Sequence, residues 1–157
     1  MATIEKALQI AAKAHEGQKD KDGQPYILHP LRVMNAVEGE PAKIVAILHD
    51  VIEDSPTTVD DLRREAFGEA IVAAVLCLTR ARDESYAEYV LRCKADEIAR
   101  RVKRADLEDN ARPSRAILRP DRLEPDLARL RKYLLAYKFL NDLMTEEQYR
   151  TAMEVGG

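Results

Sequence analysis

Apolar residues recur at helical spacing along most of the chain, which predicts a largely helical protein. Residues 17–28 interrupt the pattern with Gly17, Gly23 and Pro25 and are predicted to form a polar loop. Before this loop, one helix should run to about His15. Its apolar face is made of Ile4, Ala7, Leu8, Ala11 and Ala12.

Two further helices are predicted on either side of Pro41. Pro30 suits a first helical turn, so a short helix should begin just after His29 and end near Val37. Beyond Pro41 the stretch AKIVAILHDVIED is apolar through Leu48 and then carries a histidine and three acids. We expect these polar residues to lie on the end of the same apolar helix.

Capping signals mark two later helices. Thr58 and Asp61 resemble a capping pair, and the helix that they open should end at Gly68. The sequence TEEQ at 145–148 is a capping box that opens a last short helix. The apolar run 70–78 is either a short buried helix or a strand.

Helical periodicity also covers residues 86–94 and 95–112, and it resumes near Leu127 after a polar, arginine-rich linker. The linker is punctuated by Pro113, Pro120 and Pro125. The apolar residues of the last long helix suit a stripe that faces the core: Leu130, Leu134, Leu135, Tyr137 and Leu140.

Composition agrees with a single all-α domain. The chain has 157 residues, of which 46% are hydrophobic and 34% charged, which suits one packed globule and not a disordered chain. Helix formers are abundant, whereas there are six Gly and no Trp. The net charge of −3 argues against a chain dominated by nucleic-acid contacts, although residues 100–132 hold 11 Lys or Arg against 6 Asp or Glu.

Cysteine usage and the chain's first residues point to the cytoplasm. Cys77 and Cys93 are too few for a disulfide framework or a CxxC zinc site. Glu5 and Lys6 stand where a signal peptide would be apolar. The longest apolar run, 70–78, falls short of the roughly 20 residues of a membrane-spanning helix.

Candidate metal ligands gather in the segment LHDVIED. On one helix His49 and Asp50 would project about 100° apart, and Glu53 and Asp54 would follow one turn later. So many carboxylates repel one another unless a cation offsets their charge. Imidazole with carboxylate suits a divalent ion. The alternative is a solvated helix end with its acids at the surface.

Two other segments add polar candidates. His29, in PYILHP, lies at a helix start and is either a ligand or a capping residue. In VKRADLEDN, one helix face offers a cation, a carboxylate and an amide together, from Lys103, Asp106 and Asn110. A solvated charged face is the alternative there.

Four segments in order resemble the HD-domain metal phosphohydrolases, specifically the hydrolase domain of the Rel/SpoT alarmone enzymes and the stand-alone small alarmone hydrolases. They are AHEGQKDKDGQPYILHPLRV, AILHDVIEDSPTTVDDL, LTR and VKRADLEDNARP, within residues 14 to about 113. The resemblance implies an all-helical HD-domain bundle in which 1–157 is a single hydrolase domain, with C-terminal helices at about 126–153. The length leaves no room for the synthetase and regulatory domains of the long enzymes, so we expect a degradative activity.

The resemblance also implies a reaction and its residues. It implies a divalent ion, usually manganese, and hydrolysis of the 3′-pyrophosphate of guanosine tetra- or pentaphosphate to GDP or GTP and pyrophosphate. Glu53 and Asp54 would be the catalytic acidic pair, and Lys21, Lys103 and Asn110 would contact the substrate. The implied metal ligands are His29, His49, Asp50 and Asp106.

Two departures from the family pattern bear on the substrate. Asp20 stands where related loops commonly have an arginine that stacks on guanine, and neither Lys19 nor Lys21 has a planar guanidinium. An adenine alarmone, another nucleotide or another phosphorylated metabolite therefore stays open. Glu108 and Asp109 stand where the long enzymes usually have Leu-His. The two acids either repel a polyanionic substrate or face away from it. Asp109 is three residues after Asp106, so it is also placed to support the metal ligands.

Four aromatic or histidine side chains have structural interpretations. His15 and Tyr26 match common family positions, and we expect them to pack or to support the site. Tyr86 and Tyr89 share a helix face. Core packing is favoured slightly for them over a substrate wall.

Three hypotheses about function follow. The first is the manganese-dependent alarmone hydrolase, and the second is an HD phosphohydrolase that acts on another nucleotide or a phosphomonoester. The third is an RNA-binding helical module that uses the arginines of 100–132. In this region, however, basic residues are interleaved with acids, and no aromatic side chains accompany them on which bases could stack. We expect a small-molecule nucleotide as the partner, not a nucleic acid or a membrane, and the sequence leaves a homo-oligomer open.

Overall fold

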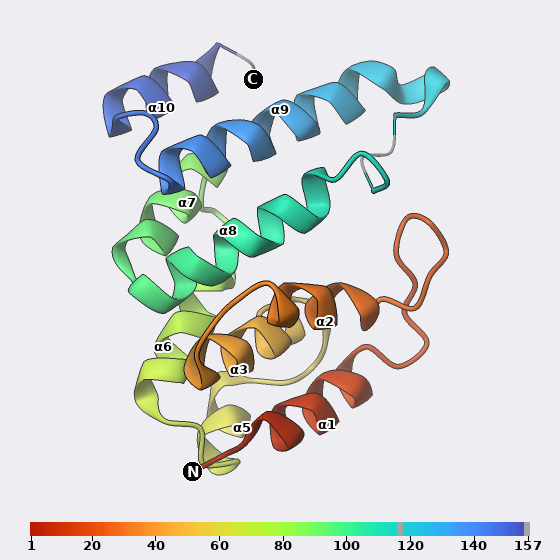
Figure 1. Ribbon diagram of the computed structural model, residues 1–157, viewed down its shortest axis with the longest axis vertical. Helices are drawn as coiled ribbons and strands as arrows, with labels where there is room; N and C mark the ends of the chain where they lie inside the picture. The colour runs from red at the N-terminus through yellow and green to blue at the C-terminus, as the bar shows by residue number, and fades with distance from the viewer. Residues whose placement is uncertain (116–117, 156–157) are drawn as a thin grey trace.

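The computed structural model describes residues 1–115 and 118–155, and every regular element in that part of the chain is a helix (Figure 1). Residues 116–117 of the predicted linker and 156–157 of the predicted domain lie outside the described residues. None of the described helices combines the length and the apolar character needed to cross a membrane. The elements are α1 (Ile4–Ala14), α2 (Leu28–Asn35), α3 (Glu40–Leu48), α4 (Val51–Asp54), α5 (Val59–Arg64), α6 (Glu69–Leu78), α7 (Tyr86–Ala95), α8 (Glu97–Ala111), η1 (Pro120–Arg122), α9 (Leu123–Leu140) and α10 (Glu146–Glu154).

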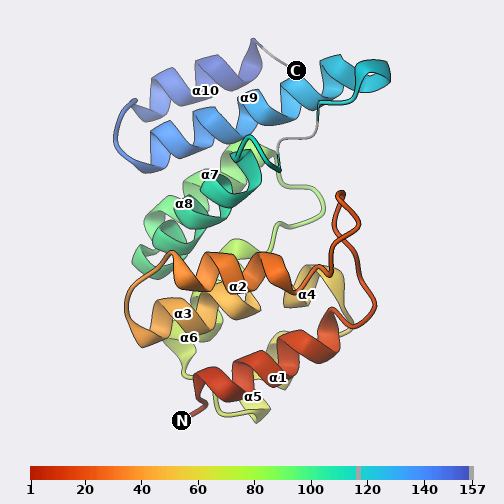
Figure 2. The same ribbon diagram turned by 45° about the vertical axis from the view of Figure 1, so that its right-hand side comes forward.

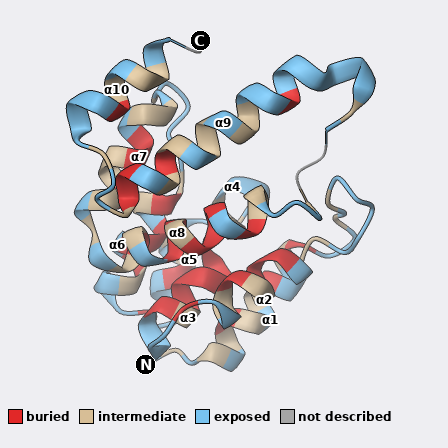
Figure 3. Cartoon of the chain, turned by 45° about the horizontal axis from the view of Figure 1, so that its top comes forward, coloured by how far each residue is buried: buried red, intermediate tan, exposed pale blue. Residues whose placement is uncertain are grey.

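Helices α3 and α8 form the centre of the packing. Helix α3 contacts α1, α2, α6 and α8, and α8 also contacts α2, α6, α7 and α9. Figures 1 and 2 show α1, α2, α3 and α5 towards one end of the molecule and α9 and α10 at the other, with α8 between them. Six of the nine residues of α3 are buried, as the red patch on α3 in Figure 3 indicates. The all-α fold predicted from the sequence is thus confirmed.

One predicted helix is interrupted at the most polar point of its sequence. The stretch from 42 to 54 does not continue as one helix, because α3 ends at Leu48 and α4 begins at Val51. Asp50 lies between them with φ −103° and ψ −4°. The expected single helix is therefore wrong, but one turn of the expected stacking is kept, because the Asp54 N–H donates to the Asp50 carbonyl over 3.0 Å.

The capping boxes at Thr58 and Thr145 are confirmed, since each side chain accepts from the backbone three residues on and is paired reciprocally. The prediction that Gly68 ends the first of these helices is wrong. Helix α5 ends at Arg64, and Gly68 is instead the N-cap of α6, with extended φ −64° and ψ 152°. Residues 70–78 belong to this helix and not to a strand.

Helix α9 begins at Leu123 and not near Leu127. Pro120 opens η1, and Pro125 lies in the first turn of α9, where a missing backbone N–H costs no helical hydrogen bond. The predicted core stripe is only partly correct, because Leu140 is fully buried whereas Leu134 is 50% exposed. The helix lies at one end of the molecule, so only part of its surface meets other helices (Figure 1).

Candidate active site

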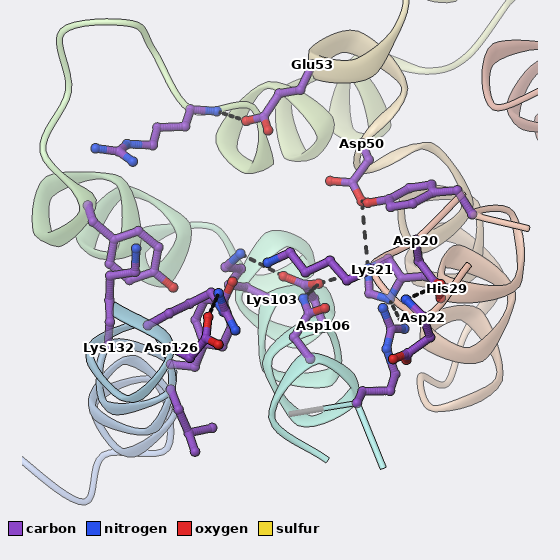
Figure 4. Close-up of a pocket in the computed structure, with 18 of the residues that line it drawn as sticks. Asp20, Lys21, Asp22, His29, Asp50, Glu53, Lys103, Asp106, Asp126 and Lys132 are labelled. Atoms are coloured by element: carbon purple, nitrogen blue, oxygen red, sulfur yellow. Dashed lines mark hydrogen bonds and ion pairs between the residues drawn. The ribbon is translucent and has the colours of Figure 1, made fainter. Parts of the chain in front are cut away.

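Four side chains predicted as metal ligands converge from three parts of the fold. His29 comes from the first turn of α2, His49 and Asp50 from the break between α3 and α4, and Asp106 from α8. His29 Nε2 lies 3.1 Å from Asp106 Oδ1, and His49 Nε2 lies 2.9 Å from Asp50 Oδ2. The two cross distances, His29 Nε2 to Asp50 Oδ2 and His49 Nε2 to Asp106 Oδ1, are both 3.7 Å. Figure 4 shows His29, Asp50 and Asp106 directed toward the same space.

The donor atoms of this cluster fit a shared cation. One atom each from His29, His49 and Asp50 lie within 4.8 Å of one another. Nε2 of His49 is buried and has no hydrogen-bond partner among the described residues. A buried imidazole nitrogen that faces carboxylate oxygens without a hydrogen bond is the arrangement that a divalent ion satisfies.

In both histidines Nδ1 lies on the side of the ring away from the cluster, and the partner of Nδ1 determines the tautomer of the neutral ring. His49 Nδ1 lies 2.7 Å from the carbonyl oxygen of Ala46, and His29 Nδ1 lies 2.7 Å from Asp109 Oδ2. A carbonyl or carboxylate oxygen only accepts, so Nδ1 carries the hydrogen in both rings. The lone pair of each neutral ring is then on Nε2, directed at the cluster.

The charges of the cluster shift the pKa of its members in opposite directions. Burial alone would lower the pKa of His49, but Asp50 and Asp106 outweigh it and raise that pKa well above its usual value. Burial raises the pKa of Asp50, but the neighbouring His49 overcomes it and brings that pKa to about 2. Opposite charges inside the cluster thus raise the pKa of the imidazole and lower that of the carboxylate.

Three further side chains hold the two carboxylates in place. The Tyr26 hydroxyl donates to Asp50 Oδ2 over 2.6 Å. Lys103 Nζ lies 2.7 Å from Asp106 Oδ2, and Asn110 Nδ2 donates to Asp106 Oδ1 over 2.7 Å. Lys103 and Asn110 were predicted as substrate contacts. Both contact the Asp106 carboxylate, and both also line the cavity in front of it.

A cavity of about 500 Å³ opens in front of this cluster. His29, Asp50 and Asp106 line it on one side, and residues of α9 line it on another, with Lys132 shown across from His29 in Figure 4. Its cationic side chains come from the 17–28 loop, the region after α6, α8 and the segment that follows it, and α9: Lys19, Lys21, Arg80, Lys103, Arg115, Arg129 and Lys132. Six carboxylates line the cavity as well: Asp20, Asp22, Asp50, Glu53, Asp106 and Asp126. The seven cations outnumber them, and a divalent ion at the cluster would add to the positive charge, which suits an anionic ligand.

The predicted acidic pair occupies two different positions. Glu53 lines the cavity, and its Oε1 accepts from the backbone N–H of Arg80 over 2.5 Å. Burial, with a further contribution from Asp50, raises the pKa of Glu53. Asp54 is not among the described residues that line the cavity, and its backbone carbonyl accepts from Gln18 Nε2 over 3.0 Å. Of the two, Glu53 is the one that faces the cavity.

The side chain of Asp20 is used within its own loop. Its Oδ1 accepts from the backbone N–H groups of Asp22 (3.0 Å) and Gln24 (2.9 Å). These bonds fold the tip of the loop back on itself beside the isolated bridge between Lys19 and Pro25. The carboxylate at this position therefore shapes the loop, and Lys19 and Lys21 supply the loop's positive charge to the cavity.

Asp109 does not present an unbalanced charge to the cavity. It is 3% exposed and accepts from Arg32 Nε over 2.8 Å, and Arg115 also donates to it. Glu108 accepts from the Tyr137 hydroxyl of α9 over 2.6 Å and does not line the cavity. The repulsion of a polyanion considered from the sequence is thus absent, because one carboxylate is neutralised and the other faces α9.

The expected supporting roles of His15 and Tyr26 agree with their contacts. The ring centroids of His15 and Tyr26 lie 4.9 Å apart, and His15 Nδ1 lies 2.9 Å from Gln18 Oε1. These residues brace the loop against α1 and leave the Tyr26 hydroxyl directed at Asp50. The hydrogen bond to Asp50 was not predicted, since nothing near Tyr26 in the sequence indicates it.

Tyr86 and Tyr89 both line the cavity, but they differ in their surroundings. Tyr89 donates from its hydroxyl to the Leu78 carbonyl over 2.7 Å and is 5% exposed, as expected for core packing. Two cations lie over the ring of Tyr86: Lys132 Nζ is 4.5 Å from the ring centroid, and Arg80 Cζ is 5.9 Å from it. Of the two tyrosines, Tyr86 is therefore the one whose ring lies beside cationic side chains of the cavity.

Sequence reasoning missed the wall that α9 contributes. Arg129, Lys132 and Tyr133 line the cavity from a helix that was treated only as part of the core. Their spacing of three to four residues was the available signal, since it places them on one helix face. Nothing in the local sequence relates that face to the histidine cluster, which lies more than 70 residues earlier.

Comparison with known proteins places the chain in a family. The sequence profile of the HD domain matches residues 7–139. A GTP pyrophosphokinase of Streptomyces coelicolor is 35% identical over 129 residues, which is 74% of this chain and 15% of that protein. A guanosine-3′,5′-bis(diphosphate) 3′-pyrophosphohydrolase of Haemophilus influenzae is 34% identical over 128 residues, 72% of this chain and 19% of that protein.

A third relative is the bifunctional (p)ppGpp synthase/hydrolase SpoT of Escherichia coli, 30% identical over 134 residues, 76% of this chain. The chain spans only 15% to 19% of the length of these three curated relatives. A solved structure described as a metazoan orthologue of SpoT that hydrolyses ppGpp superimposes with a TM-score of 0.71 at 20% identity, covering 99% of this chain and 94% of that one. This likeness concerns the fold alone. The profile match over most of the sequence, together with these relatives, shows that the chain belongs to the HD domain family.

Proposed function

We propose that this chain is a divalent-metal-dependent phosphohydrolase that removes the 3′-pyrophosphate of alarmone nucleotides, ppGpp and pppGpp or their adenine analogues. The observation that carries the proposal is the convergence of two histidines and two aspartates at the end of a cavity lined by cations. This arrangement joins a site for a divalent ion to a site for a polyphosphate. Two relatives, a guanosine-3′,5′-bis(diphosphate) 3′-pyrophosphohydrolase and a bifunctional (p)ppGpp synthase/hydrolase, support the same substrate.

The ion would be held by Nε2 of His29, Nε2 of His49 and the carboxylates of Asp50 and Asp106. A divalent ion in such a site lowers the pKa of a coordinated water and offsets charge on the phosphate. Two imidazoles with two carboxylates suit a divalent transition metal, and we propose manganese as the resident ion. The Tyr26 hydroxyl and Lys103 keep the two carboxylates oriented.

Glu53 and Asp54 are proposed as the catalytic acidic pair, with unequal roles. Glu53 faces the cavity and is placed to accept a proton from the attacking water, a role that its raised pKa suits. Asp54 adds negative charge beside it and raises the pKa of Glu53 further. Its own side chain has no place in the cavity wall, so we assign it a supporting role.

In the proposed reaction the water oxygen bonds to the phosphorus that is joined to ribose O3′. The bond between that phosphorus and O3′ breaks, and O3′ takes up a proton to become the 3′-hydroxyl. The products are the nucleotide and pyrophosphate. Lys21, Lys103 and Asn110 are proposed to contact the substrate, and all three line the cavity within reach of a bound polyphosphate.

The structure indicates less about which base the substrate carries than about its phosphate groups. Asp20 closes its own loop and brings no guanidinium to the cavity, so nothing at that position favours guanine by stacking. This observation favours a second candidate in the same class, an HD phosphohydrolase that acts on another nucleotide or a phosphomonoester. In either case we propose a small-molecule nucleotide, and not RNA, as the partner and the cytoplasm as the place of action. The oligomeric state stays open.

Product analysis separates the two candidates. Metal-free protein is supplied with manganese and incubated with ppGpp, ppApp and a panel of nucleotides and phosphomonoesters, and inorganic phosphate and pyrophosphate are measured separately. Pyrophosphate from either alarmone supports the first candidate, and orthophosphate from the panel supports the second. Absence of pyrophosphate from both alarmones with metal present contradicts the first.

A further inference from the structure

Asp109 is a buried carboxylate that contacts the proposed ligand His29 on the side of the ring away from the other ligands. Its Oδ2 lies 2.7 Å from His29 Nδ1 and 3.2 Å from Arg32 Nη2, and its Oδ1 accepts from Arg32 Nε over 2.8 Å. Arg115 donates to Oδ2 from the segment that follows α8. A carboxylate that is 3% exposed therefore accepts hydrogen bonds from one imidazole and two guanidinium groups, and a third guanidinium, that of Arg112, lies 3.7 Å from its Oδ1.

These contacts determine which nitrogen of His29 carries the hydrogen. Arg115 Nη1 also lies 3.2 Å from His29 Nδ1, to which it could donate only if that nitrogen had no hydrogen. The shorter contact, 2.7 Å to an Asp109 oxygen that only accepts, requires the hydrogen on Nδ1. Both groups therefore donate to the same oxygen of Asp109. Nδ1 keeps its hydrogen, and the lone pair of the neutral ring is on Nε2, which lies 3.1 Å from Asp106 Oδ1.

The two arginines keep Asp109 ionised in a buried position. Burial opposes ionisation, but the guanidinium groups of Arg32 and Arg115 both form ion pairs with this carboxylate and offset that cost. A charged carboxylate is a stronger acceptor than a neutral group, so it fixes the ring plane of His29 and makes the ring a better electron donor. Arg32 is on α2 one turn after His29, so the same helix supplies the ring and one of the cations.

We infer that Asp109 is a positioning residue for the metal centre, which orients His29 and holds it in the tautomer that binds the ion, with Arg32 and Arg115 as its counter-charges. The inference rests on the proposed metal centre. It accounts for an acid at a position where the long related enzymes usually have histidine, because here the acid pairs with two arginines of the same chain. The charge contributes to ligand orientation and not to repulsion of the substrate.

The test uses the metal-free full chain and cobalt(II), whose binding is followed by calorimetry and by the visible absorption of the bound ion. Asp109→Asn keeps the size of the side chain and removes its charge. We expect this variant to bind cobalt about 10- to 100-fold more weakly than the wild type and to shift the absorption bands of the bound ion. Glu108→Gln is the matched control, since Glu108 is the adjacent acid on α8 and contacts Tyr137 instead. It should bind cobalt as the wild type does.

The outcomes distinguish this inference from the proposed function. If the wild type binds no cobalt, the proposed metal centre is wrong. If the wild type binds cobalt and a folded Asp109→Asn variant has the same affinity and spectrum, the role of Asp109 alone is wrong. If circular dichroism shows that Asp109→Asn is unfolded, Arg32→Gln replaces it, because this variant leaves the carboxylate in place. An unchanged cobalt affinity and spectrum in Arg32→Gln would then overturn the inference, and weaker binding with shifted bands would support it.

Discussion

The Tyr26 hydroxyl donates a 2.6 Å hydrogen bond to Oδ2 of Asp50, the oxygen that also faces both histidines of the cluster. Tyr26 belongs to the loop before α2, whereas Asp50 lies in the break between α3 and α4. The bond thus ties the loop that lines the cavity to the proposed metal centre. A tyrosine whose sequence context suggests packing has a polar role in the site.

Tyr26→Phe should weaken metal binding while leaving the fold intact. A hydrogen bond to a charged group contributes about 1.5–3 kcal/mol, so we expect metal affinity to fall on the order of tenfold or more. Titration calorimetry with manganese measures the change. Tyr86→Phe is the control, because the Tyr86 hydroxyl has no hydrogen-bond partner among the described residues. Equal affinities for the two variants would show that the Tyr26 bond does not orient Asp50.

Glu53→Gln should lower kcat far more than Asp54→Asn does. Glu53 faces the cavity, and loss of a general base typically costs about 10²- to 10⁴-fold. The amide keeps the shape of the side chain but cannot take a proton from water. Steady-state kinetics with a pyrophosphate readout make the comparison, and metal affinity should be unchanged in both variants. A larger loss for Asp54→Asn would reverse the proposed roles.

Lys132→Gln should raise KM for a polyphosphate substrate. Lys132 lines the cavity from α9 and lies over the ring of Tyr86, so it adds charge to the wall opposite the metal cluster. Loss of one charge-assisted contact should raise KM on the order of tenfold at low salt, and the effect should shrink as salt rises. Lys138→Gln on the exposed part of the same helix is the control. The assignment of this wall to the substrate fails if both variants have the same KM.

Cys93 should be nearly inert toward thiol reagents in the folded protein. Burial raises the pKa of Cys93 to about 12, whereas an ordinary thiol has a pKa of about 8.5. Because the folded pKa is the higher one, the stability that the neutral thiol contributes is complete below the unfolded pKa and is lost as pH rises toward the folded value. Only the thiolate reacts, so the raised pKa should suppress the reactivity of Cys93 at neutral pH.

Mass spectrometry of iodoacetamide labelling checks this prediction. Labelling of Cys93 in the native protein should be much slower than in urea, and it should accelerate as pH rises from about 8 to 11. The half-buried Cys77 provides an internal comparison in the same sample. Native Cys93 that reacts as fast as the denatured thiol would contradict its burial.

The helices were largely predictable because their signals are local. The apolar spacing of α1 and the capping boxes of α5 and α10 depend on residues within a few positions of one another. The end of α5 was missed because Gly68 looks like a helix stop, although the chain uses it to begin α6. The break after Leu48 was missed because periodicity does not record where tertiary contacts redirect a helix.

The site was predictable only where family motifs mark it. His29, His49, Asp50 and Asp106 are brought together as the motifs indicated. The partners that orient them were not, since the bond between Tyr26 and Asp50 spans 24 residues and that between His29 and Asp109 spans 80. The contribution of α9 to the cavity depends on how α9 packs on α8, which no segment of the sequence encodes by itself.

Anomalous diffraction from crystals grown with manganese tests most directly whether one ion links the four side chains. We expect a single strong peak within coordination distance of Nε2 of His29, Nε2 of His49 and a carboxylate oxygen each of Asp50 and Asp106. The peak should disappear in His49→Ala crystals. A peak at another place, or none at this cluster with manganese in excess, would contradict the account.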